Sequence, residues 1–243
     1  MNKIALSIKD VSVTYTDKPV IDDINLEIKH GETFGLIGLN GAGKTTLIKC
    51  ILALRNQNKG EILINGKSRD KMDSKFDLAY LPEKFEPPWF LTGAEFIKFS
   101  LSLYKRKITD QDIIEAAEAV ALDKAALKRK VNTYSKGMRQ KLGLIATMLT
   151  NCDVLIFDEP MSGLDPQARA LVKRMMTDIK HKDKTIFLSS HILADMDEIC
   201  DRIAVLYDSH ICYIGPPKKL KEETFTDNLE HAFLDFIERR QVM

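Results

Sequence analysis

Residues 38–46 of this chain read Gly38-Leu39-Asn40-Gly41-Ala42-Gly43-Lys44-Thr45-Thr46. This stretch matches the pattern G-x-x-x-x-G-K-[ST], a loop whose backbone N–H groups surround phosphate oxygens. Glycine suits such a loop because a residue without a Cβ lets a ligand approach the backbone closely. In this pattern Lys44 reaches the β- and γ-phosphates, and the hydroxyl of Thr45 binds Mg²⁺. We therefore predict that this loop binds a nucleoside triphosphate.

Apolar residues on either side of the loop predict a strand before it and a helix after it. Residues 34–37 form a short apolar run that fits a buried strand, and residues 45–54 carry leucines and isoleucines at helical spacing. The N-terminus of that helix would direct free N–H groups and a partial positive charge at the phosphates.

The composition predicts a globular protein of the cytosol. A net charge of +1 gives no general attraction to nucleic acid, so we predict no nucleic-acid partner. The four cysteines are scattered without a C-x-x-C pair, which is typical of reduced cysteines. No apolar run approaches the ~18 residues that a membrane-spanning helix needs, so we expect a chain that does not cross a membrane by itself.

Alternating apolar and polar residues predict strands over 4–8, 11–15, 24–28 and 60–66, with a further strand at 78–81. The pattern changes at Pro87. Thr92, Thr109 and Ser135 each precede apolar residues at helical spacing, and the first of them opens a capping box. Three helices without a strand between them predict a helical insertion into an α/β body.

The second half of the chain returns to strands. Residues 154–157 form a continuous apolar run, as expected for a parallel strand buried on both faces, and the run ends in Asp158-Glu159. Further strands are predicted at 185–188, 203–207 and 211–214, with helices that begin near Asp165 and His191. A last amphipathic helix from Leu229 could cover the chain's own surface or mediate dimer or regulatory contacts.

The residues at these strand ends suit hydrolysis of a triphosphate. A carboxylate at the end of a buried strand is costly unless it binds a metal or a strong donor, which fits Asp158 as a Mg²⁺ residue. Glu159 would project toward the γ-phosphate as general base. His191 follows the next strand and could polarise the attacking water or sense the γ-phosphate.

The stretch Tyr134-Ser135-Lys136-Gly137-Met138 forms a second anion-binding helix start. With this motif the chain resembles the nucleotide-binding subunit of ABC transporters, over nearly its whole length. Ser135 and Gly137 match the family's signature Leu-Ser-Gly-Gly-Gln. Asp165 matches the family's D-loop, His191 its switch histidine, and Tyr15 the aromatic residue that stacks on adenine.

The resemblance implies an α/β fold: a P-loop NTPase core of the RecA type, with an antiparallel β subdomain and a helical signature subdomain. We expect one ABC ATPase domain over residues 1–243. The core with its β subdomain would cover about 1–86 and 151–215, the helical subdomain about 87–150, and a helical tail about 216–243.

The resemblance also implies a mechanism that needs two chains. In this family two cassettes enclose two ATP molecules head to tail, so Ser135 would complete the site of a second ABC ATPase subunit, in a homodimer most simply. The dimer would drive integral membrane permease subunits of an exporter from the cytoplasmic face of the cell membrane. Mg²⁺ would be held by Thr45, Glu83 and Asp158. The expected catalytic residues are Lys44, Glu159 and His191, and the expected ATP-binding residues are Tyr15, Gly38, Leu39, Asn40, Gly41, Ala42, Gly43, Lys44, Thr45, Thr46, Ser135, Gly137 and Asp165.

Two positions depart from the family's pattern. Glu83 stands where the family has a glutamine that contacts Mg²⁺ and the attacking water, and it brings extra negative charge near the γ-phosphate. Lys136 and Met138 replace a glycine and a glutamine of the signature, as in cassettes of exporters whose membrane subunits are separate polypeptides.

Two features leave alternatives open. Trp89 and Phe90 could be core of the helical insertion, or they could line a groove for a helix of the membrane subunit. The chain could instead be a soluble cassette that assembles or remodels a complex, as in iron–sulphur cluster assembly. A P-loop kinase would have no use for the second anion site at Ser135. Because the sequence holds one phosphate loop and no long insertion between Lys44 and Ser135, we do not expect a relative of the kinds that carry two cassettes or long coiled coils.

Overall fold

The computed structural model describes residues 3–15 and 17–241. Residues 1–2, 16 and 242–243, which the predicted domain over 1–243 includes, lie outside the described residues. The strands are β1 Ile4–Thr14, β2 Pro19–Lys29, β3 Thr33–Ile37, β4 Lys59–Ile64, β5 Lys67–Ser68, β6 Leu78–Leu81, β7 Val154–Asp158, β8 Thr185–Ser189, β9 Arg202–Tyr207 and β10 His210–Gly215. The α-helices are α1 Lys44–Ile51, α2 Met72–Phe76, α3 Gly93–Leu103, α4 Asp110–Ala119, α5 Lys136–Leu149, α6 Pro166–Lys180, α7 Leu193–Ile199, α8 Pro217–Glu223 and α9 Leu229–Gln241.

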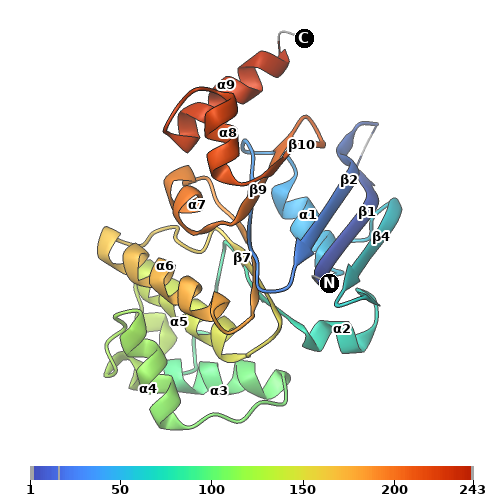
Figure 1. Cartoon of the computed structure of the whole chain (residues 1–243). Coiled ribbons are helices and arrows are strands. Elements are labelled where there is room, and N and C mark those ends of the chain that lie inside the picture. Colours follow the sequence, from blue (N-terminus) through green and yellow to red (C-terminus); the bar gives the residue numbers. More distant parts are fainter. Residues whose placement is uncertain (1–2, 16, 242–243) are drawn as a thin grey trace.

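A six-stranded sheet at the centre of the molecule positions the functional residues (Figure 1). Its order is β10-β9-β3-β8-β7-β6, parallel throughout except for β10 at the edge. Every residue of β3, β7 and β8 is buried, which explains why these strands are almost wholly apolar in sequence. Because parallel strands point the same way, the carboxyl ends of β3, β7 and β8 lie together.

Each face of the central sheet belongs to a separate hydrophobic core, because successive side chains of a strand point to opposite faces. One core joins the sheet to α1 and to the antiparallel sheet, and its residues from the central strands include Phe34, Leu36, Val154, Ile156 and Phe187. The other joins the sheet to the helices that follow, and it includes Ile37, Leu155, Phe157, Ile186 and Leu188.

A second, antiparallel sheet has the order β2-β1-β4-β5. Here β1 is one strand, although the sequence predicts two. The side-chain alternation changes phase at Asp10, whose φ of 53° is left-handed, so that both Ile8 and Val11 are buried. Such an irregularity in the register is a β-bulge, and it bends the strand without ending it.

Helices α3, α4 and α5 form the helical region on the opposite side of the central sheet from β1 and β2 (Figure 1). Their starts confirm the predicted caps: Thr92 forms a capping box with Glu95, and Ser135 accepts a hydrogen bond from the amide of Met138. Thr109 forms a further capping box. The predicted α/β class, with an antiparallel sheet and a helical region added to a parallel core, is therefore confirmed.

Several helix boundaries differ from the prediction. Helix α1 ends at Ile51 rather than near residue 54, because Ala53 is left-handed (φ 54°) and the amide of Leu54 donates to the carbonyl of Lys49. Helix α7 begins at Leu193 because the hydroxyl of Ser190 accepts from the amide of Ile192 and holds a turn there. Helix α2 was not predicted, and the region predicted as a helical tail, about 216–243, holds the two helices α8 and α9.

The last helix, α9, buries its apolar side against the core through Leu229, Ala232, Phe233 and Ile237. It therefore covers the chain's own surface, which was one of the two interpretations of the tail. Among the helices within residues 3–15 and 17–241, none has the length and apolar character needed to cross a bilayer.

Candidate functional site

A cavity of about 460 Å³ opens at the carboxyl ends of β3, β7 and β8. It is lined by Val20, Asn40, Gly41, Ala42, Gly43, Lys44, Thr45, Thr46, Glu83, Asp158, Glu159 and His191. The crevice outside the carboxyl ends of parallel strands is where α/β proteins bind their ligands. The fold thus brings most of the predicted phosphate, metal and catalytic residues to one place.

The phosphate loop takes its shape from Gly43, the residue at the N-cap of α1. Its φ of 109° is left-handed, and a Cβ there would lie 2.6 Å from Ile21 Cγ2 and 2.9 Å from the carbonyl oxygen of Val20. Only glycine fits this conformation and this space. The loop between β3 and α1 is therefore fixed by packing against the start of β2.

Lys44, the first residue of α1, extends back along the loop. Its Nζ donates hydrogen bonds to the carbonyl oxygens of Gly38 (2.7 Å) and Leu39 (3.1 Å). Burial lowers the pKa of Lys44, and the nearby carboxylates of Glu159 and Asp158 oppose that shift. Gly38 and Leu39 do not line the cavity themselves but hold the lysine at its edge.

Asp158 ends β7 directly beside Ser189, the last residue of β8. Its side chain is buried and accepts a hydrogen bond from the hydroxyl of Ser189. Burial raises the pKa of Asp158, and the negative charge of Glu83 acts in the same direction. Thr45, Glu83 and Asp158 all line the cavity, and a hydroxyl together with two carboxylates fits Mg²⁺ in a phosphate site.

Glu159 has a left-handed backbone, with φ 52°, which is uncommon for a residue with a long side chain. Its amide donates to the carbonyl of Ser189 (3.1 Å), so the turn after β7 is tied to the neighbouring strand. The Nδ1 atom of His191 lies 2.7 Å from Glu159 Oε2. Burial raises the pKa of Glu159, and the imidazole of His191 opposes this shift.

Besides Gly38 and Leu39, four predicted ATP-binding residues do not line this cavity. Tyr15 is 51% exposed at its edge, with the hydroxyl 3.4 Å from Thr46 Oγ1. Ser135 is exposed at the start of α5, and Gly137 lies against the backbone of Gly163. The carboxylate of Asp165 accepts a hydrogen bond from the amide of Ala168 (2.8 Å) and so caps α6. Within one chain, Ser135, Gly137 and Asp165 do not form a site with the phosphate loop.

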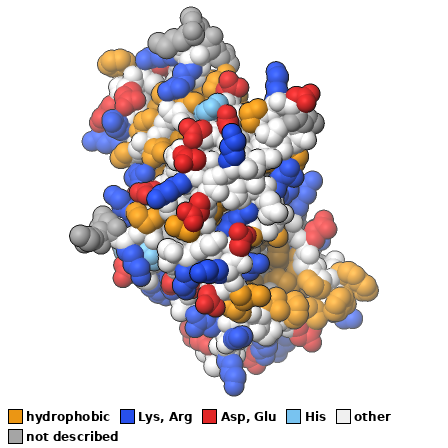
Figure 2. Space-filling model, turned by 90° about the vertical axis from the view of Figure 1, so that its right-hand side faces the viewer, with side chains coloured by type: hydrophobic (Ala, Val, Ile, Leu, Met, Phe, Trp, Pro, Cys, Tyr) orange, Lys and Arg blue, Asp and Glu red, His pale blue; other side chains and the backbone are white. Residues whose placement is uncertain are grey.

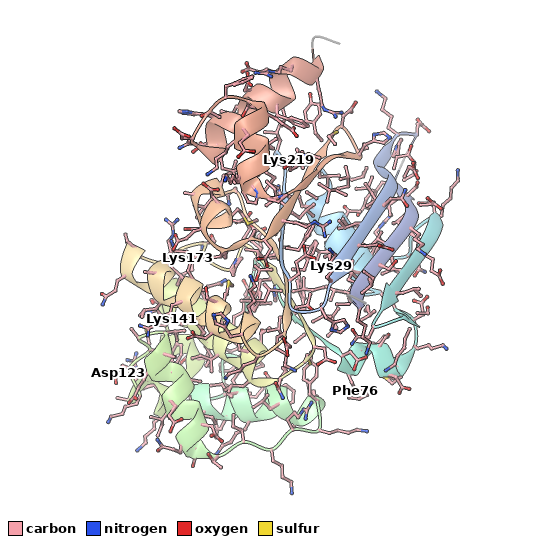
Figure 3. The ribbon with its side chains drawn as sticks, in the orientation of Figure 1. Lys29, Phe76, Asp123, Lys141, Lys173 and Lys219 are labelled. Atoms are coloured by element: carbon pink, nitrogen blue, oxygen red, sulfur yellow. The ribbon has the colours of Figure 1, made fainter. Side chains whose placement is uncertain are left out.

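The helices that follow Asp165 and His191 are joined by ion pairs that the sequence did not reveal. Asp195 of α7 is buried and lies 2.7 Å from Arg169 Nη2 and 3.6 Å from Lys173 Nζ, both on α6. Lys173 also pairs with Glu198, and Figure 3 shows it on α6 next to α7. Ser189 was not predicted as a site residue either, and only its place directly after the predicted strand over 185–188 could have indicated it.

A groove of about 610 Å³ adjoins the helical region, lined by Glu83, Lys84, Phe85, Glu86, Pro87, Pro88, Trp89, Val131, Asn132, Lys136, Arg139, Gln140 and Ser162. Glu83 also lines the first cavity, so it lies between the two. Trp89 and Phe90 are 67% and 56% exposed, and the interpretation of them as core is therefore wrong. Figure 2 shows hydrophobic side chains gathered at one lower edge of the molecule, among otherwise charged surface.

The strand, loop and helix around Lys44, with an acidic pair at the end of a neighbouring strand, define a P-loop nucleoside triphosphatase fold. The family model described as "ABC transporter" matches residues 21–162, more than half of the chain. The chain belongs to this family, as one of its ATPase cassettes.

Relatives and solved structures agree with this assignment. The chain is 40% identical over 186 residues to an ABC transporter ATP-binding protein of Synechocystis (75% of this chain, 52% of that protein). It is 35% identical over 234 residues to the ABC transporter ATP-binding protein YhcH of Bacillus subtilis (95% and 75%). The ATP-binding subunit of an ABC transporter superposes with a TM-score of 0.87 at 29% identity, covering 96% of this chain and 99% of the other.

The chain spans about half the length of the Synechocystis relative. A dimeric ATP-binding cassette in a post-hydrolysis state, bound to ADP and Pi, matches with a TM-score of 0.79 at 21% identity and shares the fold (87% of this chain, 98% of that one). The Nod factor export ATP-binding protein I of Rhizobium meliloti is 33% identical over 227 residues (90% and 67%).

Proposed function

We propose that this chain is the ATP-hydrolysing subunit of an exporter, which dimerises around two ATP molecules and drives separate membrane subunits from the cytoplasmic face of the cell membrane. One observation carries the proposal. The phosphate loop, Asp158, Glu159 and His191 line a single cavity, whereas Ser135 and Gly137 lie outside it on an exposed helix start. Each of these two places would supply half of an ATP site.

The cavity supplies the groups that hydrolysis needs. The loop amides and Lys44 would bind the phosphates, and Thr45, Glu83 and Asp158 would hold Mg²⁺, which neutralises phosphate charge when bound. Glu159 would take a proton from the attacking water. Burial raises the pKa of Glu159, which makes its carboxylate a stronger base at neutral pH. His191, 2.7 Å away, would orient that carboxylate and the water.

The other half-site is the start of α5. Ser135 caps this helix with its own hydroxyl, and a helix N-terminus attracts anions through its free N–H groups. Placed against the γ-phosphate in a partner's cavity, Ser135 and Gly137 would add donors that bind ATP better than ADP. This difference in affinity would close the dimer on ATP binding and reopen it after hydrolysis.

The groove beside Glu83 is the proposed docking place for a helix of the membrane subunit. Its exposed Trp89 offers a large apolar contact, and aromatic residues are frequent anchors in protein interfaces. Glu83 lines both the groove and the nucleotide cavity. A movement of the docked helix would therefore act directly on a residue that is proposed to hold Mg²⁺. The direction of transport is proposed from the export ATP-binding proteins among the relatives.

The variant Glu159→Gln tests the hydrolytic half of the proposal. Loss of the general base should reduce ATP turnover at least about 100-fold, while the phosphate contacts remain, so the variant should accumulate as an ATP-dependent dimer in size-exclusion chromatography. The matched control is Lys44→Ala in the Glu159→Gln background, which should stay monomeric with ATP because the phosphates are no longer held. A Glu159→Gln chain that remains monomeric at saturating ATP and Mg²⁺ would contradict the two-chain site.

Purification from native membranes tests the transport half. Under mild detergent, we expect integral membrane proteins to be recovered with the chain. Recovery of only a soluble scaffold would instead support the alternative, a cassette that assembles or remodels a complex.

A further inference from the structure

Arg55 lies directly over the ring of Tyr15, at the edge of the nucleotide cavity. The guanidinium carbon is 3.6 Å from the ring centroid. The hydroxyl of the same tyrosine lies 3.4 Å from Thr46 Oγ1, in the first turn of α1. The ring is thus held between the beginning of α1 and the segment that follows the end of that helix.

The backbone of Arg55 is fixed to the end of α1. The amides of Leu54 and Arg55 both donate to the carbonyl of Lys49, through the left-handed turn at Ala53. The buried guanidinium of Arg69 donates to the carbonyl oxygens of Cys50 and Arg55. A cation at this position is favourable because the carbonyls at a helix C-terminus are free and carry partial negative charge.

The guanidinium of Arg55 has no polar partner in the part of the chain that the structure describes. No carboxylate within residues 3–15 and 17–241 lies within ion-pair distance of it, and its buried Nε has no hydrogen-bond acceptor among them. The aromatic ring is therefore the contact that holds this guanidinium. A planar guanidinium stacked on a ring is a cation–π pair, and it covers one face of the ring only.

We propose that Arg55 is a positioning residue for the base of the nucleotide, which acts through Tyr15. By covering one face of the ring, Arg55 fixes the plane of Tyr15 and leaves the other face for an aromatic base. Its positive charge draws electron density from the ring, which strengthens stacking of an electron-rich purine on the opposite face. The inference rests on the proposed nucleotide site. It assigns to Arg55, whose backbone Arg69 holds, a contribution to the binding free energy that depends on the presence of the base.

Comparison of ADP with pyrophosphate separates this role from a structural one, because the two ligands share the diphosphate and only ADP has a base. Binding is measured by isothermal titration calorimetry with Mg²⁺ present. We expect Arg55→Ala to weaken ADP binding about three- to tenfold, and pyrophosphate binding less than about twofold. Arg55→Lys, which keeps the charge but loses the planar stack, should lie between Arg55→Ala and the unchanged chain.

A double-mutant cycle identifies the contact. Tyr15→Ala should weaken ADP binding, and adding Arg55→Ala to it should cause no further loss, because the arginine acts through the ring. Equal losses of affinity for ADP and pyrophosphate in Arg55→Ala would overturn the proposal, since they would mean that Arg55 only stabilises α1. Unchanged or tighter ADP binding would overturn it too, because Arg55 would then occupy the face that the base needs. If the unsubstituted chain binds neither ligand, the proposed nucleotide site itself is refuted. This result differs from the two outcomes that would overturn the role of Arg55 alone.

Discussion

The nucleotide cavity and the start of α5 differ in how far contacts within the chain fix their functional groups. In the cavity, three adjacent strand ends bring Lys44, Asp158 and Glu159 together, and hydrogen bonds within the chain already fix the loop lysine and both carboxyl-bearing turns. At α5, Ser135 is exposed, and among the described residues its hydroxyl is hydrogen-bonded only to the amide of Met138 in its own helix. Contacts within the chain therefore fix the groups of the first region, whereas the role proposed for the second depends on another surface.

The largest expected effect comes from breaking each region in a different copy. Ser135→Glu places a carboxylate where the partner's γ-phosphate would lie, and Lys44→Ala removes the cation from the cavity. Each variant alone should retain at most about 1% of ATP turnover. A mixture of the two should recover up to roughly a quarter of normal turnover, since half of the dimers are mixed and each mixed dimer has one intact composite site.

This mixing assay has a built-in control. Two preparations of Lys44→Ala alone, mixed in the same way, should recover nothing because every site lacks its lysine. If Ser135→Glu turned over ATP normally, or if the two variants did not complement each other, the start of α5 would have no part in a partner's site.

The contrast between the regions also explains what the sequence could predict. The phosphate loop is a local pattern, and Asp158-Glu159 follows directly from a buried strand, so periodicity and spacing locate both. The pairs Arg169–Asp195 and Arg55–Tyr15 join residues that are distant in the sequence, and only the packing of α6 on α7 or of the α1 terminus on the loop after β1 brings them together. The pattern of charges along a single helix or strand therefore does not predict such contacts.

The same limit applies to strand and helix boundaries. The bulge at Asp10 shifts the alternation of β1, so a reading by period two divides one strand into two. The end of α1 depends on a left-handed alanine, a conformation that no local residue preference predicts. The left-handed dihedrals of Asp10 and Ala53 therefore explain why β1 and α1 differ from their predicted bounds.

An intermediate effect is expected from Glu83→Gln, which tests how the charge of Glu83 affects the pKa of Asp158 in the cavity. Burial raises the pKa of Asp158, and the charge of Glu83 raises it further. Removal of that charge should lower the pKa of Asp158, so the acid limb of the pH–turnover profile should move to lower pH. The measurement is kcat/KM from about pH 5 to pH 8 at saturating Mg²⁺.

The raised pKa of Asp158 should make the folded chain less stable as pH rises. A carboxyl group with a raised pKa in the folded state binds protons more tightly there than in the unfolded chain, so it lowers stability as pH rises from its ordinary value of about 4 through the raised one. Above that window, Glu83→Gln should raise the Tm of the nucleotide-free chain, and below it the two proteins should melt alike. An unchanged acid limb with an unchanged Tm would show that Glu83 does not act on Asp158.

The smallest effect on the isolated chain is expected from Trp89→Ala, at the groove that is exposed like Ser135. Because Trp89 is 67% exposed, its truncation should change the free energy of unfolding by no more than about 0.5 kcal/mol and leave basal turnover within about twofold. Binding to the membrane subunits should nevertheless weaken about tenfold or more, as for an aromatic anchor at the centre of an interface. Phe225→Ala is the matched control: this aromatic residue is 92% exposed beyond α8, outside the groove, and its loss should leave both stability and binding unchanged. Equal binding by the two variants in pulldown titrations would mean that the groove beside Glu83 is not where the membrane subunit docks.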